Sequence, residues 1–128
     1  MATVSIRYIV NNVDEAISFY TDKLGFALKM HPAPTFAMLD KGDLRLLLSA
    51  PGEQGGGGQI LKDGRKPEPG GWNRISLQVS NLDAMVDTLK NKGAHFRTEI
   101  IYGVGGNQVL LEDPSGNPIE LFQPLQQD

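Results

Sequence analysis

A single carboxylate stands in a short apolar segment near the end of the chain. The sequence LLEDPSGNPIELFQP, residues 110–124, contains two extended segments separated by the turn-forming residues 113–117. Side chains alternate along a strand, so Ile119 and Leu121 share one face and Glu120 lies on the other. A carboxylate in this setting can pair with a cation, bind a metal ion or act as a general base, depending on its neighbours.

Few other residues offer catalytic chemistry. The chain has no cysteine, which excludes thiol catalysis and cysteine metal sites. Its two histidines, His31 and His95, lie next to Pro32 and shortly after Gly93, positions typical of turns and sheet edges. Either could act as a base, but lone histidines are more often structural or solvated. The sequence shows neither a Ser-His-Asp order nor a phosphate-binding glycine motif.

Length and charge narrow the class of protein. A chain of 128 residues is suited to one domain with its own hydrophobic core. Its formal net charge of −3 gives no general attraction to phosphate backbones, so nucleic acid is not an expected partner. No stretch has the length and apolarity of a membrane span, and the first residues lack the pattern of a secretory signal. We expect a soluble cytoplasmic protein without a membrane partner.

The elements that position these residues occur twice. Residues 4–10 predict a strand, followed by an amphipathic helix that Asn11 or Asn12 caps and Gly25 ends. The segment RISLQVSNLDAMVDTLKNKGA, residues 74–94, repeats this pattern, with Asn81 in the capping position. FAMLDKGDLRLLLSAP also aligns with VLLEDPSGNPIELFQP without a gap. The chain is therefore a tandem duplication.

Each half predicts one strand, one helix and three further strands. The further strands are expected at residues 27–30, 36–39 and 44–49, and at residues 97–102, 108–112 and 118–122. We predict one α+β domain, residues 1–128, made of two βαβββ modules at about 1–51 and 72–124. The Gly/Pro-rich segment 52–71 joins them, either as a lid or, with more weight, as a plain connector.

This duplicated unit resembles the vicinal oxygen chelate superfamily of glyoxalases, bleomycin resistance proteins and extradiol dioxygenases. VNNVDEAISFYTDKLGF is similar to the first helix signature of that family, and LEDPSGNPIELFQP to its closing hairpin. The resemblance implies a cupped, barrel-like mixed sheet with the helices outside. The strand faces turned away from the helices would then line a cavity. The residues expected to contact a ligand there are Ser5, Arg7, Arg45, Leu47, Trp72, Arg74, Ser76, Gln78, Tyr102, Glu120 and Phe122.

The same resemblance places metal ligands at four positions, of which one has a suitable side chain. These positions fall on Ser5, Leu47, Arg74 and Glu120. Arg offers no lone pair and Leu no donor, so no metal site is predicted. An ion pair between Glu120 and Arg74 or Arg7 is favoured instead, because each charge would be costly on an inner face without a partner.

Three functions remain open from the sequence. The favoured hypothesis is a metal-free protein that binds a small organic molecule, such as a drug or metabolite, with no cofactor. Its arginines suit an anionic or carbonyl-bearing ligand. The alternatives are a lyase, isomerase or dioxygenase that uses a divalent metal, and a metal-free enzyme with Glu120 as its catalytic base. A homodimer is expected, because sheets of this family are completed within one chain or between two.

Overall fold

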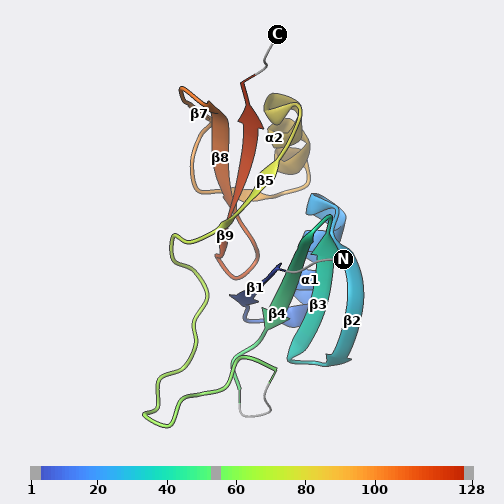
Figure 1. The fold of residues 1–128 in the computed structure, drawn as a ribbon, viewed down its shortest axis with the longest axis vertical. Coiled ribbons are helices and arrows are strands. Elements are labelled where there is room, and N and C mark those ends of the chain that lie inside the picture. Colours follow the sequence, from blue (N-terminus) through green and yellow to red (C-terminus); the bar gives the residue numbers. More distant parts are fainter. Residues whose placement is uncertain (1–3, 53–55, 126–128) are drawn as a thin grey trace. The chain divides into compact units, whose positions relative to one another are not determined.

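The fold was analysed in a computed structural model that describes residues 4–52 and 56–125 (Figure 1). Its first half contains β1 (Val4–Ile9), α1 (Val13–Leu24), β2 (Ala27–Ala33), β3 (Phe36–Lys41) and β4 (Leu44–Ser49). Its second half contains β5 (Ile75–Gln78), α2 (Leu82–Asn91), β6 (His95–Phe96), β7 (Ile101–Tyr102), β8 (Gly106–Glu112) and β9 (Pro118–Pro124). The predicted α+β fold of repeated βαβββ modules is confirmed.

These elements divide into two compact units. One contains the chain up to Gly70 together with Pro114–Asn117, and the other contains Gly71–Asp113 and the chain from Pro118 onward. The segment predicted as a connector, residues 52–71, therefore belongs to the first unit except for Gly71. Its residues 53–55 lie outside the described residues.

Asparagine side chains begin both helices, as the repeated pattern predicted. Asn12, rather than Asn11, caps α1, and its Oδ1 accepts a hydrogen bond from the Glu15 amide at 3.0 Å. Asn81 caps α2 in the same way, with its Oδ1 3.1 Å from the Ala84 nitrogen. Among residues 4–52 and 56–125, neither helix is long and apolar enough to span a bilayer.

The first sheet has the strand order β1-β4-β3-β2, with β1 parallel to β4 and the other pairs antiparallel. Helix α1 packs against β2, β3 and β4 and lies behind them in Figure 1. Ala37, Leu39, Leu46 and Leu48 point toward the helix and are fully buried. The alternate residues of these strands therefore form the other side of the sheet, which we call the helix-averted face.

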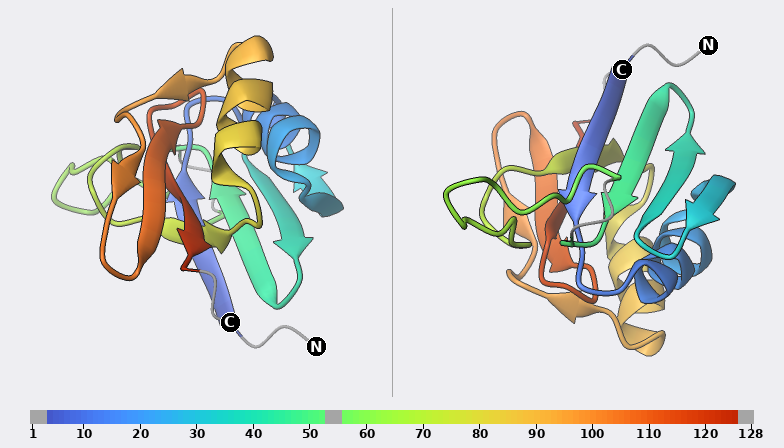
Figure 2. Two further views of the ribbon diagram at one scale, coloured as in Figure 1. Left: turned by 90° about the horizontal axis from the view of Figure 1, so that it is seen from above. Right: turned by 90° about the horizontal axis from the view of Figure 1, so that it is seen from below.

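The second sheet has the order β5-β9-β8-β6, and the short β7 also pairs with β8. Figure 2 shows β8 and β9, in orange and red, side by side. Val109, Leu111, Ile119 and Leu121 are buried, and α2 packs against β9. Glu120 and its alternate neighbours consequently lie on the helix-averted face of this sheet.

The predicted strand at residues 97–102 is correct only at its end, Ile101–Tyr102, because the backbone leaves the sheet between β6 and β7. The amides of Arg97 and Thr98 both donate to the Leu110 carbonyl, at 2.8 and 3.4 Å. The Leu110 amide in turn donates to Thr98 Oγ1 at 3.1 Å instead of to a backbone carbonyl. A threonine side chain thus replaces a ladder hydrogen bond, and pairing resumes in another register at Ile101 and Gln108.

The gap-free alignment of the two closing hairpins is also wrong. Met38 pairs with Leu47 in the first sheet, whereas Leu110 pairs with Glu120 in the second. Leu110 lies 72 positions after Met38, whereas Glu120 lies 73 positions after Leu47. The turn of the second hairpin therefore contains one residue more than the turn of the first. The residues of β8 are therefore displaced by one position along β9 compared with the sequence alignment. Because side chains alternate, each of them lies on the face of the sheet opposite to the one that the alignment gives.

The longer turn does more than reverse the chain. The buried Asn117 side chain donates to the Ile9 carbonyl at 2.7 Å and accepts from the Gly70 amide at 2.8 Å. Ser115 Oγ accepts from the Asn11 amide at 2.8 Å. The turn thus supplies polar partners to backbone groups at and just after the end of β1 and to the Gly70 amide.

Candidate functional site

Glu120 is held by two side chains, one from β5 and one from the residue that precedes this strand. Arg74 donates from Nε at 3.2 Å and from Nη2 at 3.0 Å to Oε1 of Glu120. Ser76 Oγ donates to the second carboxylate oxygen, Oε2, at 2.7 Å. The Glu120 side chain is 15% exposed and that of Arg74 is 29% exposed, so the pair is partly shielded from water. These groups meet on one face of the sheet, as strand alternation predicted.

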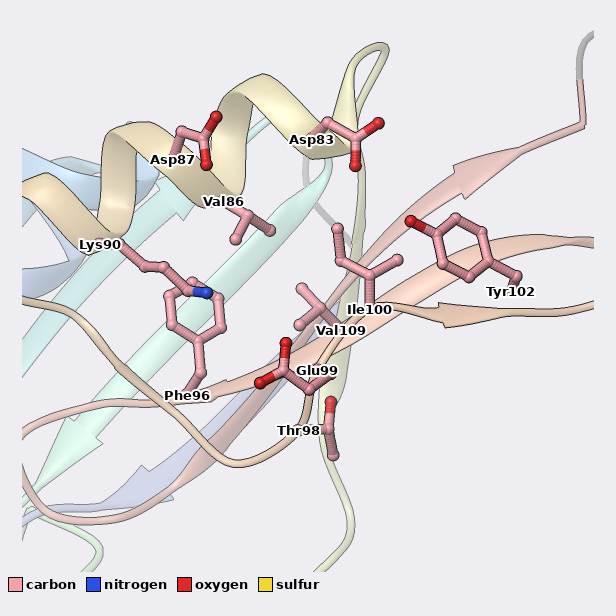
Figure 3. Close-up of a pocket in the computed structure, with 10 residues that line it drawn as sticks. All are labelled: Asp83, Val86, Asp87, Lys90, Phe96, Thr98, Glu99, Ile100, Tyr102 and Val109. Atoms are coloured by element: carbon pink, nitrogen blue, oxygen red, sulfur yellow. The ribbon is translucent and has the colours of Figure 1, made fainter.

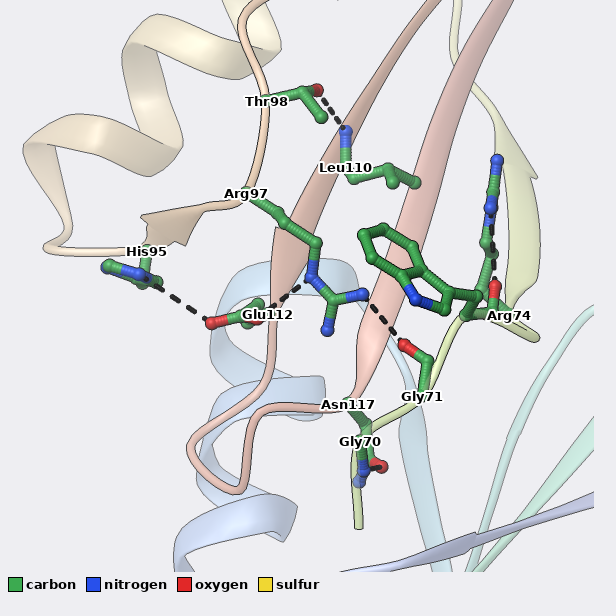
Figure 4. Close-up of polar contacts among 10 residues, drawn as sticks. Gly70, Gly71, Arg74, His95, Arg97, Thr98, Leu110, Glu112 and Asn117 are labelled. Atoms are coloured by element: carbon green, nitrogen blue, oxygen red, sulfur yellow. Dashed lines mark hydrogen bonds and ion pairs between the residues drawn. The ribbon is translucent and has the colours of Figure 1, made fainter.

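A second ion pair lies on the same face of this sheet. Arg97 Nε donates to Glu112 Oε2 at 2.9 Å, and Arg97 Nη1 donates to the Gly71 carbonyl at 2.7 Å (Figure 4). The His95 imidazole lies 3.6 Å from the other Glu112 oxygen and is well exposed. This pair was not predicted from the sequence; the gap-free alignment places Glu112 over Leu39, which is buried on the helix side of its sheet.

The two ion pairs hold the segment that carries Trp72. The guanidinium of Arg97 lies 4.6 Å from the centroid of the Trp72 ring, within cation–π range. Arg74 Nη1 donates to the Trp72 carbonyl at 3.2 Å. Gly70 and Gly71 precede the tryptophan with φ values of 107° and 87°, a conformation that favours glycine. Trp72 remains 67% exposed, so it presents a positioned aromatic ring to solvent.

The remaining predicted residues of the second unit separate into two groups. Gln78 and Phe122 pair across β5 and β9 on the helix-averted face, in line with Ser76 and Glu120. Tyr102 does not join them. Tyr102 pairs with Asn107 of β8. The next residue, Gln108, pairs with Phe122 on the helix-averted face, so Asn107 and Tyr102 lie on the opposite side, toward α2.

Tyr102 instead lines a pocket of about 320 Å³ beside α2 (Figure 3). Asp83, Asp87 and Lys90 enter this pocket from the helix, and Phe96 lies opposite with its ring centroid 5.7 Å from Lys90 Nζ. None of the other predicted ligand-binding residues lines it.

The four predicted residues of the first unit lie together on its helix-averted face. Ser5 pairs with Arg45, and Arg7 pairs with Leu47, in neighbouring positions of β1 and β4. Ser5 and Arg7 are exposed, whereas Arg45 and Leu47 are half-buried. Met38 extends this group across β3, because it pairs with Leu47. The methionine was missed because its contact with Leu47 depends on the register of the β3–β4 hairpin.

The residues present do not fit the metal ion that the family resemblance implies. At the four positions suggested by the resemblance, Ser5 and Leu47 belong to the first unit and Arg74 and Glu120 to the second. Both oxygens of Glu120 already accept hydrogen bonds, and Arg74 provides no lone pair. Within the described part of the chain, no three His, Cys, Asp or Glu side chains are grouped closely enough to share a metal.

Comparisons with known proteins agree on one superfamily. The sequence model of the Glyoxalase/Bleomycin resistance protein/Dioxygenase superfamily matches residues 3–121. The solved structure of a member of that superfamily from Sphaerobacter thermophilus is 27% identical in sequence. It has a TM-score of 0.75 and covers 96% of this chain and 98% of that one.

Two further solved structures show the same fold at lower identity. TnmS3, an antibiotic binding protein from a Streptomyces species, is 24% identical with a TM-score of 0.73 and covers 98% of both chains. Lactoylglutathione lyase from Agrobacterium tumefaciens is 18% identical with a TM-score of 0.73, over 95% of this chain and 92% of that one.

Proposed function

Because the chain belongs to the glyoxalase/bleomycin resistance protein/dioxygenase superfamily, we propose that it binds a small organic molecule without a metal ion. The observation that carries this proposal is the contrast between Glu120 and Trp72. Both carboxylate oxygens of Glu120 are occupied by Arg74 and Ser76, whereas the Trp72 ring is positioned and exposed. The site is thus equipped for stacking rather than for ligation of a cation.

The likeness to an antibiotic binding protein supports a binding role for this fold. The helix-averted face of the second sheet has the mixture that binding sites use, with an aromatic ring, the half-buried Phe122 and the exposed amide of Gln78. The fixed positions of Trp72 and Arg74 would reduce the entropy lost on binding.

The enzymatic alternatives require metal donors that the site lacks, or a Glu120 carboxylate that is not already paired. A metal-dependent lyase, isomerase or dioxygenase needs several donors, and the four positions provide one carboxylate that is already paired. A metal-free enzyme with Glu120 as base needs that carboxylate within reach of a substrate proton. Two donors from Arg74 and one from Ser76 compete with any such contact.

Intrinsic fluorescence offers a direct test, because Trp72 is the only tryptophan of the chain. Titration with a collection of small aromatic compounds, antibiotics included, is expected to reveal saturable changes in Trp72 emission. Binding should persist after dialysis against EDTA. Calorimetry with Trp72→Phe should show weaker binding of the same compounds, since phenylalanine offers a smaller stacking surface.

Two results would contradict this proposal. One is the absence of any saturable ligand. The other is lactoylglutathione lyase or related activity that depends on added metal, together with one equivalent of bound Zn, Ni, Fe or Mn that is lost in Glu120→Ala.

We also propose that the protein forms a homodimer. Strands β1 and β5 stand at the ends of their sheets, and within the described residues each pairs with one strand only. Such edges are commonly covered by another strand or subunit. Light scattering at micromolar concentration should therefore give twice the mass of the chain, and a monomer mass across the concentration range would contradict the proposal.

A further inference from the structure

An apolar row crosses the helix-averted face of the first sheet and ends at an arginine. Met30 of β2 pairs with Met38 of β3, Met38 pairs with Leu47 of β4, and Leu47 pairs with Arg7 of β1. Met30 is 48% exposed, and Met38 and Leu47 are half-buried. We call these four residues the methionine row. It gives the sheet a continuous strip of adaptable apolar surface beside a guanidinium.

The arginines of the two units differ in their partners. Arg74 and Arg97 each form an ion pair with a glutamate, so their charges are neutralised locally. Arg7 and Arg45 have no carboxylate within 4.0 Å in residues 4–52 and 56–125. Asp40 stands opposite Arg45 in the β3–β4 pair but forms its ion pair with Lys29. Arg7 therefore has the least neutralised charge of these arginines and is the stronger candidate to attract an anion.

The surroundings of Arg7 also restrict where its side chain can lie. A Cβ atom added to Gly57 would overlap both Cζ and Nε of Arg7. The neighbouring Gly56 is fixed by a 2.5 Å hydrogen bond from Ser49 Oγ to its carbonyl. The backbone at Gly57 thus lies close beside the guanidinium of Arg7, and its φ of 93° favours glycine at this position.

We propose that the methionine row binds a small organic anion with a flat apolar body. The inference goes beyond the proposed function, which concerns Trp72 of the second unit, and adds a ligand site on the first unit together with its class of ligand. The carboxylate or sulfonate accepts hydrogen bonds from Arg7, with Arg45 one row away adding positive charge. The apolar body lies on Met30, Met38 and Leu47, and the flexible thioethers of the two methionines adjust to its outline.

Methionine methyl NMR reports directly on which part of the surface a ligand occupies. The chain has four methionines. Met30 and Met38 belong to the row, whereas Met85 lies on α2 and serves as an internal control. Titration of the protein with 1-naphthoate should shift the Met30 and Met38 signals saturably and leave Met85 unchanged. The neutral isostere 1-naphthamide should bind about tenfold more weakly, because it loses the charge-assisted contact.

Charge removal provides the second comparison. Arg7→Met should weaken 1-naphthoate binding about tenfold and leave 1-naphthamide binding nearly unchanged. Arg65→Met is the matched control, because Arg65 is exposed and pairs with Asp63. It should bind both probes as the unmodified protein does. If Arg7→Met does not fold, the comparison of the two probes on the unmodified protein still decides the question.

Three results would overturn the inference. They are the absence of saturable shifts at Met30 and Met38 with millimolar 1-naphthoate, equal affinity for both probes, and shifts confined to Met85. If 1-naphthoate changes Trp72 emission but leaves Met30 and Met38 unshifted, the inference is also overturned, while the proposed binding function stands. A screen with no saturable ligand of any kind contradicts the function itself.

Discussion

Replacement of Arg74 by Met is expected to lower the free energy of unfolding by about 2 kcal/mol, because it leaves the Glu120 carboxylate without its cationic partner. The loss of one member of a fully buried pair costs about 3–5 kcal/mol, and exposed pairs contribute about 0–1 kcal/mol. The side chains of Glu120 and Arg74 are 15% and 29% exposed, which places their pair between these limits.

A double-mutant cycle separates this interaction from other effects of the substitutions. In urea unfolding, Arg74→Met and Glu120→Gln together should cost less than the sum of the single changes, by about 1–2 kcal/mol. The exposed pair of Arg65 and Asp63 provides the control, for which Arg65→Met and Asp63→Asn should show a coupling near zero. Additive effects at Arg74 and Glu120 would mean that the carboxylate does not depend on this arginine.

Gly106→Ala is expected to destabilise the protein by about 3 kcal/mol, because the added methyl group meets the backbone of the neighbouring strand. A Cβ at this position would overlap the Gln123 carbonyl oxygen and lie 2.7 Å from Cζ of Phe122. Gly106 pairs directly with Pro124, so relief of the overlap requires separation of β8 and β9. The positive φ of 153° adds strain for alanine.

The adjacent glycine gives a matched control for this prediction. A Cβ on Gly105 meets no atom within 4 Å, so Gly105→Ala should change stability by less than about 0.5 kcal/mol. Urea midpoints measured by far-ultraviolet circular dichroism will compare the two variants. Equal midpoints would show that the β8–β9 pair can accommodate a side chain at Gly106.

Local sequence patterns were sufficient to predict the helices, most of the strands and the face on which most strand residues lie. The caps at Asn12 and Asn81 depend on a side chain and an amide three residues apart, so sequence alone identifies them. Strand alternation depends only on neighbouring residues, and it correctly turned Glu120 away from Ile119 and Leu121. The repetition of both patterns then indicated the duplicated fold and its resemblance to a known superfamily.

The pairing of strands depended on turn length and on a side-chain hydrogen bond, which the alternation of apolar and polar residues does not reveal. One additional residue in the turn before β9 changed the register of β8, which brought Glu112 rather than Leu111 to the helix-averted face. Thr98 replaced a backbone partner and interrupted the strand before Tyr102, which lies on the α2 side. Both errors arise because register depends on turn length and on side-chain hydrogen bonds, not on alternation.

Residue types and their order were enough to identify which side chains could carry charge or stack, but the packed chain selected their partners. The sequence offered both Arg74 and Arg7 as partners for Glu120, and Arg74 is the one that holds its carboxylate. Trp72 was one aromatic among several until two glycines and the Arg97 guanidinium fixed its ring. Long side chains reach several positions from one backbone site, so their pairing depends on which groups the fold brings within reach.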